Sequence, residues 1–250
     1  MRARWHDGQR ERKGQPTGQR EGQPHGDIVP RARSPRGVDR SDPPWLGAPV
    51  SPPLLLASAS PRRREMLERV GLAIEVHPAD IDETPLDGEP PDTYVARIAR
   101  GKATAIARRR DLWVLAADTT VTIDGSILGK AESPDEATAM LRALSGRTHR
   151  VLTAFVLLGE RDGSPRLHEV LVSTDVEMIE LSAATIADYV ATNEWRGKAG
   201  AYAIQGIAAA FVREVRGSVT NVAGLPLAEV LLALREVGAP EPRLTAGRPA

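Results

Sequence analysis

Three consecutive arginines follow a serine–proline pair where the apolar part of the chain begins, in Leu-Leu-Leu-Ala-Ser-Ala-Ser-Pro-Arg-Arg-Arg at 54–64. Pro61 is typical of the first position of a helix. Arg62 and Arg63 therefore add positive charge to a helix end that already carries unpaired N–H groups and the positive pole of the dipole. Helix N-termini bind phosphate, and guanidinium groups offer paired donors to phosphate oxygens. The pattern predicts a polyanion site, with a solvated basic turn as an equally weighted alternative.

Asp118 is the candidate for acid–base chemistry. It directly follows the apolar run 112–117, which predicts a strand, and ligands of open α/β sheets bind beyond the carboxyl ends of strands. Beside a bound metal or phosphate, such a carboxylate can orient and deprotonate a water molecule. An Asp that merely caps a turn fits the pattern equally well. Glu83, in the acidic segment 80–84, is a second candidate, for which a solvated loop is the plainer interpretation.

Three lysines and one glutamine complete the set of candidate binding residues. Lys102 lies in a predicted long helix that also carries arginines, so a solvated face is its alternative interpretation. Lys130 follows a glycine after a predicted hairpin, and Lys198 lies among small residues at 196–202, where backbone and ligand can approach closely. Gln205 lies between apolar neighbours, where its amide can match the donor and acceptor pattern of a base. A turn-capping role is the plainer interpretation for this glutamine.

Alternating strand and helix patterns from residue 54 onward must position these groups, and they predict an α/β or mixed α+β fold. Strands are predicted at 54–58, 73–77, 112–117, 120–123, 126–128, 148–158, 167–179 and 210–215. Helices are predicted at 61–70, 92–106, 134–145, 183–192 and 226–237. Asp-Gly pairs at 124–125 and 162–163 indicate hairpins. We therefore expect a mixed sheet rather than a purely parallel one.

The composition excludes several classes of protein. The 250 residues carry 33 basic and 33 acidic side chains, and the part after residue 53 is slightly acidic, so we expect no nucleic-acid partner. The absence of cysteine excludes disulfides, thiol catalysis and cysteine metal sites, and the five histidines are too scattered for a zinc site. No apolar run approaches the roughly 18 residues of a membrane span. We expect no membrane contact and a cytoplasmic location.

The chain divides by composition into three segments. Residues 1–53 are rich in Arg, Gly, Gln and Pro and lack apolar periodicity, which predicts a disordered extension. This extension lacks the apolar stretch of a secretory signal, and its acidic residues disfavour a transit peptide. A folded domain is expected at 54–239, followed by a flexible tail at 240–250.

Six motifs occur in one order along nearly the whole expected domain. They are Leu-Ala-Ser-x-Ser-Pro-Arg-Arg at 56–63, Ala-Asp-Thr at 117–119, Leu-Gly-Lys at 128–130, Leu-Ser-Gly-Arg-Thr-His at 144–149, Lys-Ala-Gly-Ala-Tyr-x-Ile-Gln-Gly at 198–206 and Val-x-Gly-Leu-Pro-Leu at 222–227. With these motifs the chain resembles the Maf family of nucleoside triphosphate pyrophosphatases.

The resemblance implies a two-lobed fold, like that of Maf and inosine-triphosphatase-like proteins, with a twisted mixed sheet flanked by helices and a nucleotide between the lobes. It implies that water attacks the α-phosphorus of a nucleoside triphosphate, releasing pyrophosphate with the help of a divalent cation such as Mg²⁺ or Mn²⁺. Asp118 matches the family's proton acceptor, and Glu83 matches an acidic residue near the metal. The residues that match the phosphate site are Ser58, Arg62, Arg63, Lys102 and Lys130.

The resemblance also implies a substrate class. Arg62, Thr119 and Gln205 match positions associated with substrate choice, and they resemble the branch that acts on dTTP and UTP, with modified pyrimidine triphosphates as further candidates. The sequence departs from the family pattern at Gly197, where many relatives carry Asp. This departure puts the catalytic efficiency or the metal preference of this protein in question. Family members often pair, so a homodimer is a candidate assembly. The alternative function is a non-catalytic nucleotide-sensing regulator of cell division, which would need neither a base nor a metal.

Overall fold

The computed structural model describes residues 52–106 and 112–242. The chain divides into two units, Met1–Ala48 and Pro49–Ala250, and the first lies wholly outside the described residues. The predicted disordered extension and flexible tail fall largely on residues 1–51 and 243–250, which are also outside them. Within the described part of the chain, no helix is both long and apolar enough to cross a membrane.

The described residues form one mixed sheet of seven strands in the order β2-β1-β3-β5-β6-β7, with β4 paired to β3. Their bounds are β1 Leu54–Leu56, β2 Ile74–Val76, β3 Val114–Ile123, β4 Ser126–Leu128, β5 Thr148–Arg161, β6 Ser164–Met178 and β7 Val212–Arg216. β1 is parallel to β2 and β3, whereas all other pairs are antiparallel. The expected mixed sheet is therefore confirmed.

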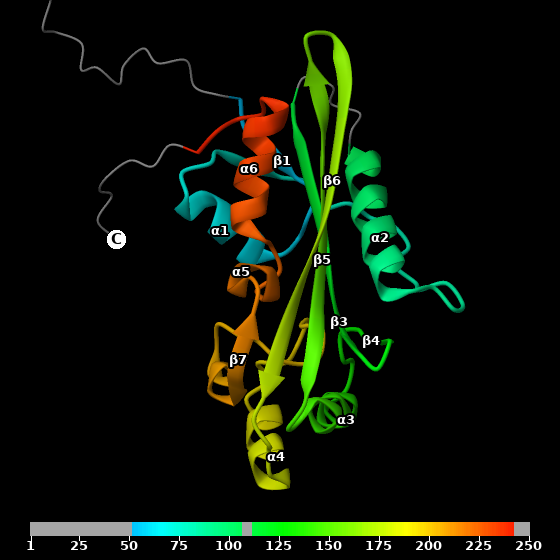
Figure 1. The fold of residues 1–250 in the computed structure, drawn as a ribbon, viewed down its shortest axis with the longest axis vertical. Coiled ribbons are helices and arrows are strands. Elements are labelled where there is room, and N and C mark those ends of the chain that lie inside the picture. The colour runs from blue at the N-terminus through cyan, green and yellow to red at the C-terminus, as the bar shows by residue number, and fades with distance from the viewer. Residues whose placement is uncertain (1–51, 107–111, 243–250) are drawn as a thin grey trace, which may run out of the picture. The chain divides into compact units, whose positions relative to one another are not determined.

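Helices cover both faces of the sheet around β1 (Figure 1). Helix α2 (Pro91–Ile106) packs on the face that carries Leu55, whereas α1 (Pro61–Arg69) and α6 (Leu227–Val237) pack on the face that carries Leu54 and Leu56. Successive strand side chains point to opposite faces, so the run of three leucines supplies both cores. A buried strand of this kind appears as a continuous apolar run in the sequence. We call these elements the first lobe.

The other end of the sheet carries a separate core, which we call the second lobe. It contains α3 (Pro134–Leu144), α4 (Ala183–Ala191) and the 3-10 helix η1 (Ile207–Phe211), packed on the far ends of β3, β5 and β6. The fully buried Trp195 belongs to this core. A short helix, α5 (Val219–Val222), leads back to α6. Separate cores at the two ends of one twisted sheet confirm the expected two-lobed architecture.

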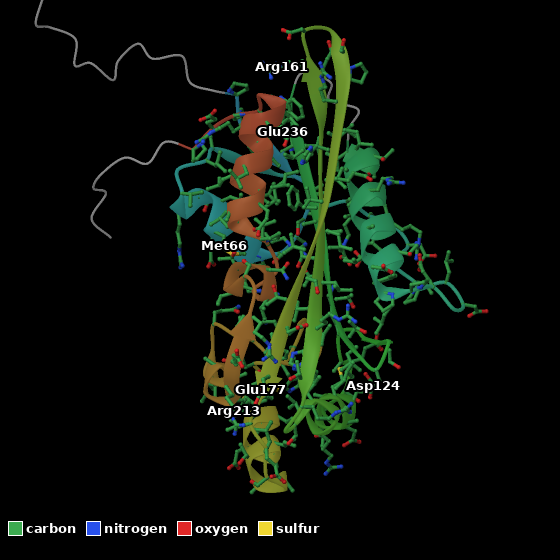
Figure 2. All side chains as sticks on the ribbon, in the orientation of Figure 1. Met66, Asp124, Arg161, Glu177, Arg213 and Glu236 are labelled. Carbon is green, nitrogen blue, oxygen red and sulfur yellow. The ribbon has the colours of Figure 1, made fainter. Side chains whose placement is uncertain are left out.

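Hairpin turns confirm the predicted strand pairings in the second lobe and at the tip of the sheet. Asp124 and Gly125 both have positive φ, 51° and 79°, and connect β3 to β4. A two-residue hairpin turn with positive φ at both positions favours the sequence Asp-Gly. Side-chain pairs support the same region: Figure 2 shows Glu177 and Arg213 on neighbouring strands, with Oε1 and Nη1 3.2 Å apart.

The main departure from the sequence prediction is the length of β3. The prediction ended one strand at residue 117 and began another at 120, but Val114–Ile123 is a single strand and Asp118 lies in its middle. The placement of Asp118 at a strand end was therefore wrong. β5 pairs with β3 continuously from Val114 to Thr122 and carries it through the polar residues.

Candidate functional site

A cavity of about 340 Å³ opens along one edge of β3. On that edge β1 accompanies β3 as far as Leu115, and β4 begins to pair only at Val121. The edge between these neighbours is open, and Asp118 and Thr119 lie in the opening. The cavity is lined by every residue singled out from the sequence: Ser58, Arg62, Arg63, Glu83, Lys102, Asp118, Thr119, Lys130, Lys198 and Gln205.

A lysine and two carboxylates lie together at one end of the site. Lys102 Nζ lies 2.7 Å from Asp118 Oδ1 and 2.9 Å from Glu83 Oε1. Lys102 and Asp118 are each only 7% exposed, so their ion pair lies in a place with little water, whereas the Glu83 side chain is 40% exposed. The alternative that Lys102 belongs to a solvated face is excluded.

Helix α2 positions both this lysine and the loop that carries Glu83. Tyr94 lies about two turns before Lys102, and its hydroxyl donates to the Glu83 carbonyl oxygen at 3.0 Å. Burial, together with the negative charges of Asp118 and Glu83, raises the pKa of Tyr94 to about 12. Tyr94 therefore stays neutral and keeps its proton for the bond to the loop.

The carboxylates suit a hard divalent cation shared with a ligand. Mg²⁺ is normally held by one or two carboxylates together with phosphate oxygens and water, rather than by a cage made only of protein. Asp118 and Glu83 meet that requirement, because both approach the same ammonium and both face the cavity. Among the described residues no three His, Cys, Asp or Glu side chains cluster in a way that could hold a metal by themselves.

Arg63 lines the cavity, but most of its guanidinium donors are bonded to the protein. Its Nε donates to Gly224 O (2.8 Å), Nη1 to Ser58 Oγ (3.0 Å) and to Ala117 O (2.8 Å), and Nη2 to Thr119 Oγ1 (3.0 Å). Burial lowers its pKa, an effect that the charge of Asp118 partly offsets. Four of the five N–H donors of the guanidinium thus hold the walls of the site together.

Arg62, Lys130 and Lys198 bring positive charge to the mouth of the cavity. Arg62 makes one hydrogen bond, from Nε to Ala223 O at 3.3 Å. Burial and the nearby Arg62 charge lower the pKa of Lys198, and Glu194 partly opposes this. Helix α1 begins at the same place, with no acidic residue in its first turn and no side-chain cap from Ser60. Like charges gathered around an open helix N-terminus favour an anion there.

The residues expected to choose the substrate also line the cavity. Thr119 Oγ1 lies within hydrogen-bond distance of Thr153 Oγ1 (3.0 Å) and Gly224 O (3.2 Å), in addition to Arg63. Gln205 is exposed to the cavity. Gly197 adopts φ +66°, with no atom within 4 Å of where a Cβ would be. A side chain at 197 would therefore enter open space at the rim of the cavity.

Several residues that shape the site were not assigned a role from the sequence. The carbonyls of Ala223 and Gly224 orient Arg62 and Arg63, and Tyr202 lines the cavity while bonding to the buried His149 (Nε2 to Oη 2.8 Å). The only sequence signal for these residues was that they lie in the motifs at 222–227 and 198–206. Their roles depend on contacts between distant segments, which the local pattern does not show.

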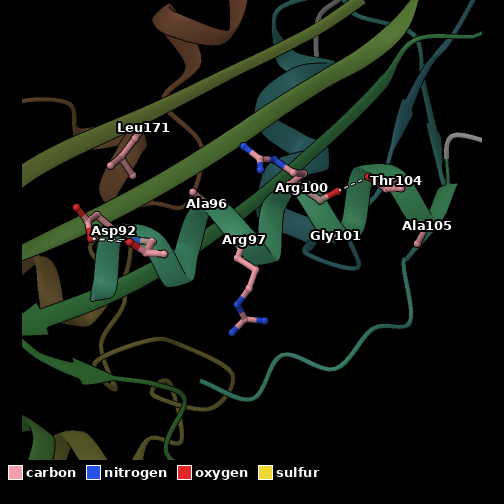
Figure 3. A pocket seen from close by; sticks show the side chains of 9 residues that line it. Asp92, Ala96, Arg97, Arg100, Gly101, Thr104, Ala105 and Leu171 are labelled. Atoms are coloured by element: carbon pink, nitrogen blue, oxygen red, sulfur yellow. Dashed lines mark hydrogen bonds between the residues drawn. The ribbon is translucent and has the colours of Figure 1, made fainter. Parts of the chain in front are cut away.

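A larger hollow, of about 830 Å³, runs along α2 beside Leu171 of β6 (Figure 3). None of the residues expected to do chemistry lines it. Its two arginines are already paired with carboxylates, Arg97 with Glu89 and Arg100 with Glu169. Size alone therefore does not make this hollow the functional site.

Comparison with known proteins agrees with the motifs. Residues 53–237 match the family described as Maf-like protein. The chain belongs to the Maf family. A dTTP/UTP pyrophosphatase of Anaeromyxobacter dehalogenans (strain 2CP-1) is 53% identical over 193 residues, covering 77% of this chain and 98% of that protein.

A second relative and a solved structure extend the comparison. A dTTP/UTP pyrophosphatase of Rhodospirillum rubrum is 49% identical, covering 80% of this chain and 95% of its own length. The structure of a HAM1 protein from Coxiella burnetii is 21% identical, with a TM-score of 0.39, and the match covers 73% of this chain and 98% of that one.

Proposed function

We propose that this Maf protein hydrolyses nucleoside triphosphates, dTTP and UTP above all, to the monophosphate and pyrophosphate. The observation that carries the proposal is the convergence, in one cavity, of the Lys102-bound carboxylates of Asp118 and Glu83 with the cations Arg62, Lys130 and Lys198. Relatives about half identical to this chain are named for this activity. A triphosphate carries about four negative charges, which explains why so many cations share a small opening.

The cations and the helix end bind and orient the polyphosphate. Arg62, Lys130, Lys198 and the N-terminus of α1 provide fixed positive charge in a partly dry site, where it stabilises developing phosphate charge more effectively than water does. A divalent cation held by Asp118 and Glu83, when bound, would neutralise phosphate oxygens and polarise the phosphorus. Arg63 keeps Thr119 and the Ala223–Gly224 turn in place while this happens.

Asp118 activates the water. Its carboxylate is held by Lys102 at one oxygen, so its orientation is set before substrate arrives. Asp118 takes a proton from water as the water oxygen bonds to the α-phosphorus. The bond from that phosphorus to the bridging oxygen of the β-phosphate breaks, and the electron pair leaves with pyrophosphate. The lysine serves here to orient the carboxylate.

A pyrophosphate-release assay with a panel of triphosphates and Mg²⁺ or Mn²⁺ tests this function. We expect dTTP and UTP to be preferred, and a preference for purine triphosphates would contradict the substrate assignment. Nucleotide binding without any pyrophosphate release would favour the sensing role instead. A cytoplasmic location and a homodimer belong to the same proposal, and sedimentation of the purified protein tests the dimer.

Asp118→Asn should retain nucleotide binding but lose turnover by about 10²- to 10⁴-fold, the usual effect of removing a positioned base. Stopped assays for kcat and calorimetry for nucleotide affinity separate the two effects. Asp188→Asn, on the exposed surface of α4, is the matched control and should behave as the unmodified protein. Near-normal turnover in Asp118→Asn would remove Asp118 from the mechanism.

A further inference from the structure

Gln205 offers its side chain to the cavity without a hydrogen-bond partner among the residues that the structure describes. It is exposed to the cavity, and its amide makes no hydrogen bond to another described residue. A glutamine carries both donors and an acceptor, so it distinguishes one base from another only if its backbone is held in one position. The turn that presents Gln205 must therefore be fixed from outside the cavity.

The carboxylate of Glu194 lies directly behind that turn. Its Oε2 accepts from the backbone N–H of Ile207 at 2.9 Å, and its Oε1 accepts from that of Ala208 at 3.3 Å. The hydroxyl of Tyr189, which is 2% exposed, donates to Oε1 at 3.2 Å. Glu194 thus binds the first N–H groups of η1, which starts two residues after Gln205.

Gly206 shows how closely the carboxylate and the turn fit together. A Cβ at this position would lie 2.2 Å from Glu194 Oε2 and 2.5 Å from its Cδ. The φ of Gly206 is −116°, outside the positive range that favours glycine, so the contact with Glu194 is the observation that bears on a side chain at this position. The carboxylate occupies the space that any side chain at 206 would require.

Glu194 is itself held in place from the second lobe. The next residue, Trp195, is fully buried and donates from Nε1 to Val190 O at 2.9 Å. The Glu194 amide donates to Thr192 Oγ1 at 3.2 Å. Glu194 is absent from the residues that line the cavity, so any effect it has on a bound base is transmitted through the turn.

We propose that Glu194 is a positioning residue for base selection, fixing the turn at 203–207 so that the Gln205 amide faces a pyrimidine base. This inference rests on the proposed function. It assigns the discrimination between uracil or thymine and cytosine to a contact outside the cavity. Cytosine differs from uracil at the ring edge, with an amino group in place of a carbonyl oxygen, which a fixed amide can tell apart.

The test compares kcat/KM for UTP and CTP, which share the same sugar and phosphates. In Glu194→Ala we expect the UTP-to-CTP ratio to fall at least about tenfold, because a misplaced amide no longer discriminates. The kcat for UTP should change less than about threefold. Glu194→Gln keeps one carbonyl oxygen for the Ile207 N–H and should restore most of the ratio. Because Lys198 meets phosphate, a charge effect of Glu194 on Lys198 would change both substrates equally and leave the ratio intact.

Gly206→Ala disturbs the contact between position 206 and the Glu194 carboxylate without changing Glu194. It remains informative if Glu194→Ala does not fold. We expect it to lower the UTP-to-CTP ratio in the otherwise unmodified enzyme but to add little in the Glu194→Ala background, where the space is empty. Additive effects in this double-mutant cycle, or ratios unchanged within twofold in both single variants, would overturn the inference. If the unmodified enzyme releases no pyrophosphate from dTTP or UTP, the proposed function fails instead.

Discussion

Two adjacent arginines of the same motif have different tasks. Arg62 lies at the mouth of the cavity and donates one hydrogen bond within the described part of the chain, whereas Arg63 is 8% exposed and donates four, to three segments. A helical residue points about 100° away from its neighbour, so the two consecutive side chains meet different surroundings although both line the cavity. The sequence pattern indicated the anion site without showing which arginine faces it.

Replacing each arginine by lysine separates binding from stability. Arg63→Lys should lower the free energy of unfolding by about 3 kcal/mol, because an ammonium cannot reproduce a buried fork of charge-assisted bonds. Arg62→Lys should change it by less than about 1 kcal/mol and should raise the KM for UTP. Urea denaturation and steady-state kinetics on both variants measure the two effects. Equal loss of stability in both variants would contradict the division of roles.

At the scale of secondary structure, apolar patterning predicted most elements, and the ends of paired strands were the weakest part. Three buried leucines, the helix start at Pro61 and the Asp124-Gly125 turn each carried a local signal that the structure bears out. The prediction placed a break at Asp118 and Thr119, yet both continue β3 because β5 pairs with them. The links between Glu194 and Gly206 and between Arg63 and Gly224 join segments that no local pattern connects.

Strand β5 carries a buried histidine that makes stability depend on pH. Burial lowers the pKa of His149 to about 4 from its ordinary 6.5, although the charge of Asp175 partly opposes this. Its Nδ1 is buried without a hydrogen-bond partner among the described residues, and Nε2 faces the Tyr202 hydroxyl. Because the folded state favours neutral imidazole, this contribution is complete above about pH 6.5 and is lost as the pH falls toward 4.

The loss should reach about 3 kcal/mol, the free energy of a shift of this size. The urea midpoint, measured from about pH 7.5 down to 4.5, follows this loss of unfolding free energy. In His149→Phe the midpoint should fall less over the same pH interval. Titrating carboxylates contribute to both proteins, so the difference between the two curves isolates the histidine. Parallel curves would show that His149 is not responsible.

At the scale of the whole described domain, the site joins the two lobes. Ser58, Arg62 and Lys102 come from the first lobe, whereas Lys130, Lys198 and Gln205 come from segments that belong to the second. The second-lobe segments are linked by backbone pairing between Lys130 and Ala199. A nucleotide that contacts the residues of both lobes adds non-covalent interactions between the lobes. These interactions exist only in the folded state.

A uridine triphosphate analogue with nitrogen between the α- and β-phosphorus should therefore stabilise the protein. At about 100 times its Kd the gain is about 2.7 kcal/mol, or roughly 5–10 °C in Tm for a domain of this size. Thermal unfolding with Mg²⁺ present measures it. The shift should shrink in Arg62→Ala and persist in Asp188→Asn, and an equal shift from uridine alone would show that the phosphates are not gripped.

The long strands β3, β5 and β6 contribute to the cores of both lobes. Continuous hydrogen-bonded strands leave no flexible linker about which one half could swing against the other. We therefore expect the opening beside Asp118 to keep its width when substrate enters. Discrimination by size is then a matter of fit at the entrance rather than of closure after capture.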